Sequence, residues 1–275
     1  MRVIVPIKQI LDPSGMTVNR RAERIFINRE EYIINPNDRN ALEEALKLKD
    51  EHGAEVVAVT MGPERADDAL REAMAMGADS AFLLTDKAFE RADISVATTV
   101  LGKAIQKIGD YDLILTGCQA ADTGAGQLGP RLAEYLGLPQ ITEVRELEAA
   151  SDGKVKARRN QACPELALSG AEGRSRRGPG YAEVEASLPA LLTIAQNANE
   201  PRYPTGAGII NAYREWEVTV WGASDLGLEA ADLQPLTEEK RISFPPEREL
   251  GTKITGAPEE AARELVQYLK AGRVI

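Results

Sequence analysis

The sequence predicts an α/β protein in which a mainly parallel sheet carries helices on both faces. Three features of the first 140 residues lead to this prediction. Apolar runs alternate four times with segments of helical character, the connections are short, and the apolar runs are continuous. Continuous apolar runs are typical of strands buried on both faces, and alternating strand–helix units place such strands parallel to one another.

The first strand is expected at 2–8 (RVIVPIK) and should end or bulge at Pro6, which has no N–H group to donate. A short hairpin is expected around Val18 and 25–27. An amphipathic helix should follow, with Asn37 or Asp38 as its N-cap. The remaining elements of the parallel core are, in order, strands at 55–60, 81–85 and 112–116, and helices at 66–76, at 93–108 and from about Gly126 or Gln127.

The pattern changes after residue 139. Two segments, 154–158 and 181–186, alternate apolar and polar residues as antiparallel, half-exposed strands do. The segment between them is rich in glycine, arginine and serine and predicts a long loop. The full set of elements expected here is strands at 140–144, 154–158, 181–186 and 190–195, a loop at 161–180, loops with one strand (216–221) over 199–246, and a helix at 258–271 that begins at Pro258 and stops at Gly272.

The composition argues against several functional classes. A formal net charge of −10, from 33 basic and 43 acidic side chains, disfavours nucleic acid as the main partner, and the basic run 174–177 is interpreted as a solvated loop. A single histidine, His52, leaves no basis for a Ser-His-Asp triad or a histidine-based metal site. Cys118 and Cys163 fit neither a disulfide framework nor metal-ligand spacing, and no nucleophile has an adjacent base, so no metal and no catalytic residue is predicted.

Hydropathy predicts no membrane segment. No apolar run approaches the about 20 residues that a membrane-spanning helix needs. The N-terminal stretch has the character of a short strand rather than of a signal peptide. We therefore expect a cytoplasmic protein.

The loops at the carboxyl ends of the predicted parallel strands form the candidate binding site. They span 6–9, 60–63, 85–88 and 117–129, and each is small, polar or glycine-rich. In the last of them a strand passes through Gly117 and a run of small residues into a helix N-terminus. Such a helix start can hold a phosphate, because glycines let backbone N–H groups approach the anion and the helix dipole favours negative charge.

The sequence GAGQLG from Gly124 to Gly129 matches the dinucleotide fingerprint G-x-G-x-x-G, but its position is wrong. The fingerprint should follow the first strand directly, whereas here it follows the fourth and is separated from it by GCQAADT. A nicotinamide-dependent dehydrogenase is therefore not favoured, and no P-loop sequence indicates a triphosphatase. The residues indicate a protein that holds a nucleotide without evident chemistry of its own.

Five stretches, in their order and spacing, resemble the beta subunit of electron transfer flavoprotein, a family that includes FixA-like proteins. The resemblance extends over nearly the whole chain, and the stretches read VPIKQILD, INPNDRNALEEALKLKDEHGAEV, VTMGPERADDALREAMAMGADSA, LILTGCQAADTGAGQLGPRLAEYLGLPQIT, and LPALLTI followed by NEPRY. The resemblance implies a Rossmann-like sheet of adenine nucleotide alpha hydrolase type, in a heterodimer with an alpha subunit that carries most of the FAD. It implies an electron carrier rather than a stand-alone enzyme, with dehydrogenase and quinone-reducing partners.

The resemblance also implies a nucleotide in the beta subunit, which is AMP in most members and a second FAD in electron-bifurcating members. The adenylate contacts of the family fall here on Pro6, Asn35, Met61, Gly62, Gly117, Gln119, Asp122, Thr123, Gly124, Gly126, Gln127 and Gly129. We expect residues 1–221 to form the nucleotide-binding domain, with a parallel core at 1–140 and added antiparallel strands at 140–221. Residues 222–275 should form a C-terminal arm and helix that lie on the alpha subunit or on the domain itself.

Three departures from the family pattern bear on function. The Gly-Gly pair of the family's arginine-acidic-Gly-Gly signature is Pro179-Gly180 here, and Ile94 and Ala97 occupy positions where a bifurcating member would carry hydroxyls. Ala198 precedes NEPRY where dehydrogenase-docking members carry a larger apolar anchor. An alternative function, a non-redox adenine-nucleotide-binding module of the stress-protein type, fits the first 140 residues but gives no reason for the long C-terminal arm.

Overall fold

The computed structural model describes residues 1–151, 153–161, 180–241, 243–246 and 251–272. It contains two compact units, one formed by Met1–Asn19 with Arg24–Glu238 and the other by Arg20–Glu23 with Glu239–Ile275. Three features predicted from sequence lie largely outside the described residues: the loop at 161–180, Cys163, and the basic run with the adjoining Pro179. None of the helices in the described ranges is long and apolar enough to cross a membrane.

The first unit is built on a nine-stranded sheet. In spatial order its strands are β11 (Gly180–Ser187), β10 (Lys154–Gln161), β9 (Gln140–Ser151), β12 (Ala190–Ile194), β8 (Leu113–Gly117), β1 (Arg2–Pro6), β6 (Glu55–Met61), β7 (Ser80–Leu84) and β13 (Thr219–Trp221). All pairings from β9 to β13 are parallel, and β10 pairs antiparallel with both of its neighbours. The predicted α/β fold with a mainly parallel sheet is therefore confirmed.

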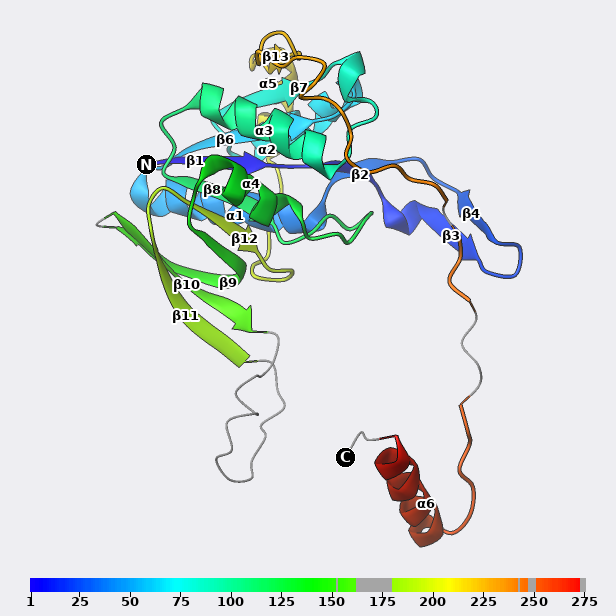
Figure 1. Cartoon of the computed structure of the whole chain (residues 1–275). Coiled ribbons are helices and arrows are strands. Elements are labelled where there is room, and N and C mark those ends of the chain that lie inside the picture. The colour runs from blue at the N-terminus through cyan, green and yellow to red at the C-terminus, as the bar shows by residue number, and fades with distance from the viewer. Residues whose placement is uncertain (152, 162–179, 242, 247–250, 273–275) are drawn as a thin grey trace. The chain divides into compact units, whose positions relative to one another are not determined.

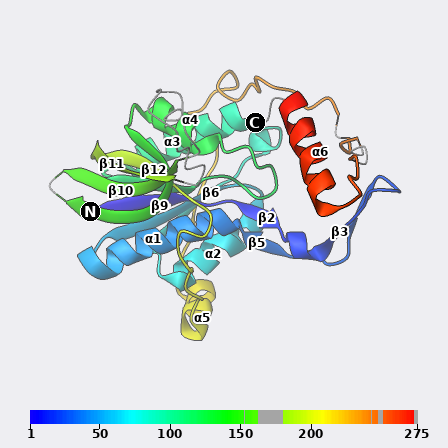
Figure 2. The same cartoon turned by 90° about the horizontal axis from the view of Figure 1, so that it is seen from below.

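Helices cover both faces of this sheet (Figure 1). One face carries α1 (Pro36–His52) and α2 (Asp67–Met76), which lie side by side in Figure 2, and the other carries α3 (Ile94–Ile108) and α4 (Leu128–Leu136). Successive residues of a strand point to opposite faces. Accordingly Val3 and Val5 of β1 lie in the core under α1 and α2, whereas Ile4 lies in the core under α3 and α4.

Two small antiparallel ladders follow β1. The pair β2 (Gln9–Leu11) and β5 (Tyr32–Ile34) encloses a hairpin of β3 (Met16–Asn19) and β4 (Arg24–Ile27), the hairpin that the sequence predicts. The side chains of Val18, Ile25 and Ile27 on this hairpin are exposed. The hairpin therefore adds nothing to the core of the sheet.

The predicted N-cap of α1 is wrong. Asn35, rather than Asn37 or Asp38, is the N-cap, and Pro36 occupies the first helical position, where its missing N–H is not needed. The Asp38 side chain instead points into the domain, where backbone N–H groups of Lys8 and Gly117 donate to it. The predicted stop of α2 at Gly77 is confirmed, since Gly77 is its C-cap with φ of 133°.

The predicted antiparallel character of the strands after residue 140 is correct for β10, for β11 and for the side of β9 that pairs with β10. Strand β12 lies between β8 and β9 and pairs parallel with both, and β13 pairs parallel with β7. All five residues of β12 (ALLTI) are buried, which is the pattern of a central strand in a parallel sheet. Strand β9 is longer than predicted, because its second half continues past β12 to pair with β10.

Two further corrections concern the segment after residue 199. The predicted loop contains a helix, α5 (Gly206–Arg214), which Thr205 caps by accepting a hydrogen bond from the Gly208 N–H group at 3.0 Å. Only residues 219–221 of the strand predicted at 216–221 are in a ladder. Helix α5 packs on α2, with Gly208 so close to the Ala75 carbonyl that a Cβ atom would lie 2.7 Å from it.

The segment from 222 to 238 packs on its own domain. Leu226 and Leu228 are buried in the core under α3, and Asp93 accepts hydrogen bonds from the backbone of Leu236 and Thr237. In the second unit, α6 (Pro258–Ala271) has the predicted bounds and ends at Gly272. No residue of α6 is buried, and Leu265, Val266 and Tyr268 are exposed.

Candidate functional site

A cavity of about 380 Å³ opens at the carboxyl ends of β1 and β8. From β1 the chain adds β6 and β7 on one side and then returns to add β8 on the other. Ligands of open parallel sheets bind at such a reversal of strand order. The residues that line the cavity are Pro6, Ile7, Lys8, Asp38, Met61, Ala92, Asp93, Ile94, Ala97, Leu101, Thr116, Gly117, Cys118, Gln119, Ala120, Thr123, Ala125, Gly126, Gln127 and Leu128.

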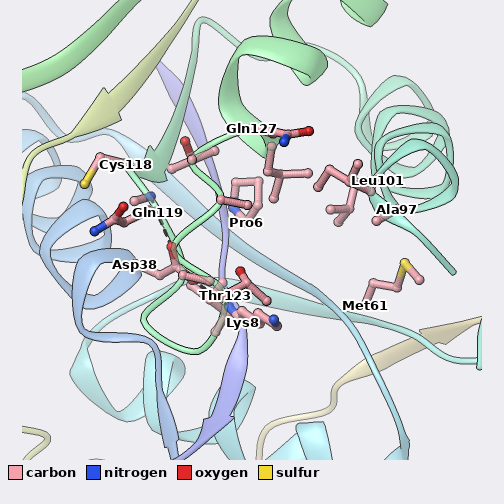
Figure 3. A pocket seen from close by; sticks show the side chains of 18 of the residues that line it. Pro6, Lys8, Asp38, Met61, Ala97, Leu101, Cys118, Gln119, Thr123 and Gln127 are labelled. Atoms are coloured by element: carbon pink, nitrogen blue, oxygen red, sulfur yellow. Dashed lines mark hydrogen bonds between the residues drawn. The ribbon is translucent and has the colours of Figure 1, made fainter. Parts of the chain in front are cut away.

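Seven of the twelve residues predicted to bind a nucleotide line this cavity. They are Pro6, Met61, Gly117, Gln119, Thr123, Gly126 and Gln127. The other five lie outside the lining; they are Asn35, Gly62, Asp122, Gly124 and Gly129. Figure 3 shows Met61, Ala97 and Leu101 on one side of the cavity and Asp38, Cys118 and Gln119 on the other, with Pro6 and Gln127 between them.

Three of the five residues outside the lining, Asn35, Asp122 and Gly124, hold the loop that follows β8. The Asn35 amide donates to the Gln119 carbonyl at 3.0 Å and accepts from the Ala121 N–H at 3.0 Å. The Asp122 carboxylate forms an ion pair with Lys8 Nζ at 2.5 Å. Gly62 and Gly124 donate backbone hydrogen bonds to Leu84 and Ala120, and Gly129 is buried in the first turn of α4.

The sequence analysis does not identify Asp38 as part of the site. Its two carboxylate oxygens accept the N–H groups of Lys8 at 2.8 Å and of Gly117 at 3.1 Å. The carboxylate therefore ties the first turn of α1 to the ends of β1 and β8. Burial is the main cause that raises the pKa of Asp38, to about 7. The sequence shows Asp38 as an acidic residue near the start of a helix. Its role in the site depends on contacts with Lys8 and Gly117, which lie 30 and 79 positions away in the chain.

Gly117 is required by close packing. A Cβ atom at this position would lie 2.4 Å from the Asp38 carboxylate and 2.7 Å from the backbone of Asn37. This contact lets the start of α1 approach β8 so closely that the Asn37 amide also reaches the Gln119 carbonyl, at 2.8 Å. The base of the loop is therefore fixed from the α1 side.

The loop above that base offers hydrogen-bond donors. Gly126 has a left-handed φ of 61°, and the loop leads directly into α4, whose N-cap Gln127 makes no side-chain capping bond. In the part of the chain that the structure describes, the N–H groups of Thr123, Gly126 and Leu128 have no hydrogen-bond partner. Unpaired donors beside a helix N-terminus favour an anion.

The charges around the cavity are few. Lys8 is the one cationic side chain among the lining residues, and Asp122 already pairs with it. Asp93 caps α3: burial alone would raise its pKa, but the hydrogen bonds from Val96 and Thr237 outweigh burial and lower the pKa. Burial, together with nearby Glu143, raises the pKa of the Cys118 thiol, which argues against a reactive thiolate.

The wall opposite the loop is apolar. Ile94, Ala97 and Leu101 lie on one face of α3, at positions i, i+3 and i+7, and Met61 and Leu128 adjoin them. The sequence analysis noted Ile94 and Ala97 only as departures from a hydroxyl pattern. Their helical spacing is the signal that could have identified this wall.

The residues present fit a ligand with a flat apolar part and an anionic part, as a nucleotide has. The apolar wall suits a ring, and the unpaired N–H groups beside α4 suit a phosphate. An independent observation supports this fit: the Thr116 hydroxyl oxygen is buried, lacks a hydrogen-bond partner, and belongs to a residue that lines the cavity. Buried polar groups without partners are rare and call for an explanation.

A second feature, the NEPRY loop, is fixed to α1. Arg202 pairs with the buried Glu43, with Nε 3.0 Å from one carboxylate oxygen and Nη2 3.0 Å from the other. Asn199 bonds to Asn40 at 2.8 Å, and Ala198 packs partly buried against the core. Tyr203 is 86% exposed, so the loop is rigid at its base and open at its tip.

Comparison with known proteins gives consistent matches. The model of the electron transfer flavoprotein domain family matches residues 24–226. The electron transfer flavoprotein subunit beta of Thermoanaerobacterium thermosaccharolyticum is 37% identical over 278 residues, covering 100% of both chains. Subunit CarD of the caffeyl-CoA reductase-Etf complex of Acetobacterium woodii is 36% identical over 280 residues, again covering 100% of both. Protein FixA of Azorhizobium caulinodans is 37% identical over 233 residues, covering 83% of this chain and 78% of the relative.

Proposed function

The chain belongs to the electron transfer flavoprotein beta-subunit family, and we propose that it holds an adenine nucleotide in the cavity at the ends of β1 and β8 as part of a heterodimeric electron carrier. The family supports a role in electron transfer by a flavoprotein. The observation that carries the nucleotide proposal is the cavity itself, at the reversal of strand order and beside the N-terminus of α4.

Two nucleotides suit this proposal, AMP and a second FAD, because both contain an adenosine phosphate. The N–H groups of Thr123, Gly126 and Leu128 would hold the phosphate, and Lys8 would leave Asp122 to face it. The ring would lie against the wall of Ile94, Ala97 and Leu101. Asp122, Asn35 and Gly124 would act by holding the loop.

The redox group of the proposed carrier is FAD shared with an alpha subunit. When bound, the flavin would supply the electron-transfer chemistry, and this chain would supply position and electrostatics. The exposed apolar residues of α6 support the proposal that the segment from 239 to 272 packs on the alpha subunit, since an unburied amphipathic helix gains little stability by itself.

The further partners are proposed to be dehydrogenases or reductases, with quinone-reducing proteins as the alternative acceptors. Two relatives carry names that place them in such systems: a caffeyl-CoA reductase-Etf complex and an acryloyl-CoA reductase electron transfer subunit. The loop from Asn199 to Tyr203 would present Tyr203, because Ala198 is small and packs inward. This arrangement favours a docking contact centred on an aromatic ring.

The test is to purify this chain co-expressed with its alpha partner, extract the nucleotides with acid, and quantify them by chromatography. One FAD and one AMP per heterodimer would identify a simple carrier. Two FAD and no AMP would identify a site of the electron-bifurcating kind. A heterodimer with neither flavin nor adenine nucleotide would contradict the proposal, as would a chain that stays monomeric and binds ATP without an alpha subunit.

A further inference from the structure

The inference concerns Thr116, which none of the sequence motifs identifies as a ligand contact. Thr116 is 1% exposed and lies near the end of β8. The next residue, Gly117, faces Asp38 of α1, and successive residues of a strand point to opposite faces, so the Thr116 side chain points away from α1. It therefore lies under the first turn of α4: a Cβ atom on Gly129 would be 3.0 Å from the Thr116 hydroxyl oxygen.

Among the described residues four threonines are buried, and three of their hydroxyls have partners. Thr60 donates to the Ile7 carbonyl at 2.7 Å, Thr98 donates to the Ile94 carbonyl at 2.7 Å, and Thr193 accepts the Glu143 N–H group at 2.9 Å. The Thr116 hydroxyl has none. A valine would fill the same volume without a buried unpaired group, so the hydroxyl is a cost to the ligand-free fold.

The surroundings of the hydroxyl indicate what would pair with it. The N-terminal turn of α4 begins beside it with the Leu128 N–H group unpaired in the described part of the chain, and the third helical residue is Pro130, which has no N–H. The helix dipole is positive at this end. The hydroxyl and the helix N–H groups can donate together to one oxygen, the dipole favours an anionic one, and the proposed ligand carries such oxygens on its phosphate.

We propose that the Thr116 hydroxyl donates a hydrogen bond to a phosphate oxygen of the adenine nucleotide, held between the end of β8 and the first turn of α4. This inference rests on the proposed nucleotide site. The hydroxyl oxygen is covered in the structure, with Gly129 in the first turn of α4 beside it, so the ligand reaches it when 123–128 shifts away from the end of β8. Residues 123–127 are exposed, and Gly124 and Gly126 both have left-handed φ values of 61°. Asn35, Asn37 and Lys8 hold residues 119, 121 and 122, so the shift is confined to the part of the loop that leads into α4.

The test compares Thr116→Val with Thr193→Val in the nucleotide-stripped heterodimer. AMP serves as the probe because AMP and FAD share the adenosine phosphate, and adenosine serves as the probe without phosphate. Thr116→Val should weaken AMP binding, measured by calorimetry, about tenfold, the typical effect of one hydrogen bond. It should leave adenosine binding within twofold and should not lower the Tm of the nucleotide-free protein. Thr116→Ser should restore AMP binding to within threefold of wild type.

Thr193→Val is the matched control, because its hydroxyl has a partner in the fold and lies outside the lining. It should lower Tm and leave AMP affinity unchanged. Equal AMP affinity in Thr116→Val and wild type would overturn the inference, as would an equal loss for AMP and adenosine or a fall in Tm like that of Thr193→Val. A wild-type heterodimer that binds neither AMP nor FAD would instead overturn the proposed function.

Discussion

Helices α4 and α6 are both amphipathic, yet the chain uses them in opposite ways. Helix α4 has 9 residues and buries Leu132 and Ala133 in the core of the sheet domain. Helix α6 has 14 residues and buries none. Length and pattern therefore do not decide whether a helix is stabilised by its own chain; packing does.

The two helices also leave different groups without partners. Helix α4 is satisfied along its apolar side and leaves N–H groups unpaired at its start, beside the cavity. Helix α6 leaves an apolar face, with Leu265, Val266 and Tyr268 exposed. The unpaired N–H groups of α4 suit a small anion, and the exposed apolar face of α6 suits the surface of another protein. The proposed nucleotide and the proposed alpha subunit are thus complements to two separate deficiencies of one chain.

The comparison is tested most strongly by removing one leucine side chain from each helix. Leu132→Ala should lower the free energy of unfolding by about 2–5 kcal/mol, because Leu132 is fully buried. Leu265→Ala should change it by less than about 0.5 kcal/mol, because Leu265 is 48% exposed.

Both variants are measured by urea unfolding of the isolated chain and by the affinity of the heterodimer. Leu265→Ala should weaken association with the alpha subunit about tenfold although the fold is unaffected. An unchanged affinity would mean that α6 does not contact the alpha subunit. A large loss of chain stability would mean that α6 already has a partner within its own chain.

The second prediction concerns the junction between the start of α1 and the end of β8. Gly117→Ala should cost about 1–3 kcal/mol, because the new methyl group would overlap the Asp38 carboxylate and the Asn37 backbone. Gly180→Ala in β11 is the matched control, since no atom lies within 4 Å of a Cβ there. Only Gly117→Ala should also weaken AMP binding, measured by calorimetry. Equal tolerance of both alanines would show that the α1–β8 contact is not tight.

The third prediction uses the pKa of Asp38, which is raised to about 7 in the fold from an ordinary value of 3.8. Between these values the folded protein keeps a proton that the unfolded chain releases, so the group stabilises the fold at low pH. That contribution is lost as the pH rises through about 7. The stability of wild type relative to Asp38→Asn should therefore fall by about 2–3 kcal/mol between pH 5 and pH 8, measured by urea unfolding. A difference that is constant or rises with pH would contradict the raised pKa.

The sequence predicts the parallel core well because the relevant signals are local. Strand–helix alternation, the Pro6 strand end and the Gly77 helix stop each depend on residues next to one another. The sequence of β12, ALLTI, is a continuous apolar run, which indicates a strand buried on both faces. Its place after two alternating strands instead favours grouping it with the antiparallel strands. Helix α5 gives a weak signal because Gly206 and Gly208 have low helix propensity, and its packing on α2 compensates.

The candidate site likewise has a part that the sequence predicts and a part that it does not. The motif predicts the glycines and polar residues of the loop, because their backbone requirements are written in a short stretch. The Asp38 clamp and the unpaired Thr116 hydroxyl depend on contacts between β1, β8, α1 and α4, which no single stretch contains. The Thr116 hydroxyl is buried without a partner, as is Arg39 Nε, and of these two groups only Thr116 belongs to the lining of the cavity, which is why it carries information about a ligand.

The fourth and smallest expected effect on stability concerns Lys8, whose ion pair with Asp122 is exposed at both ends. Lys8→Met should change the free energy of unfolding by less than about 0.5 kcal/mol, as should Lys154→Met, which removes a similarly exposed ion pair between Lys154 of β10 and Glu185 of β11. The backbone N–H of Lys8 still reaches Asp38 in the variant, so the clamp at the end of β1 is kept. Any difference between the two variants therefore reports on the cavity.

For AMP binding the two lysine variants should separate. Lys8→Met removes the one cation that lines the cavity and leaves the Asp122 carboxylate unpaired near the ligand phosphate, so affinity should fall about tenfold at low salt and less at high salt. Adding Asp122→Asn should recover part of the loss by removing the repulsion. Lys154→Met should bind AMP as wild type does. If both lysine variants bind AMP as wild type does, the Lys8 side chain does not contribute to binding. The phosphate would then be attracted by backbone N–H groups alone, at the N-terminus of α4.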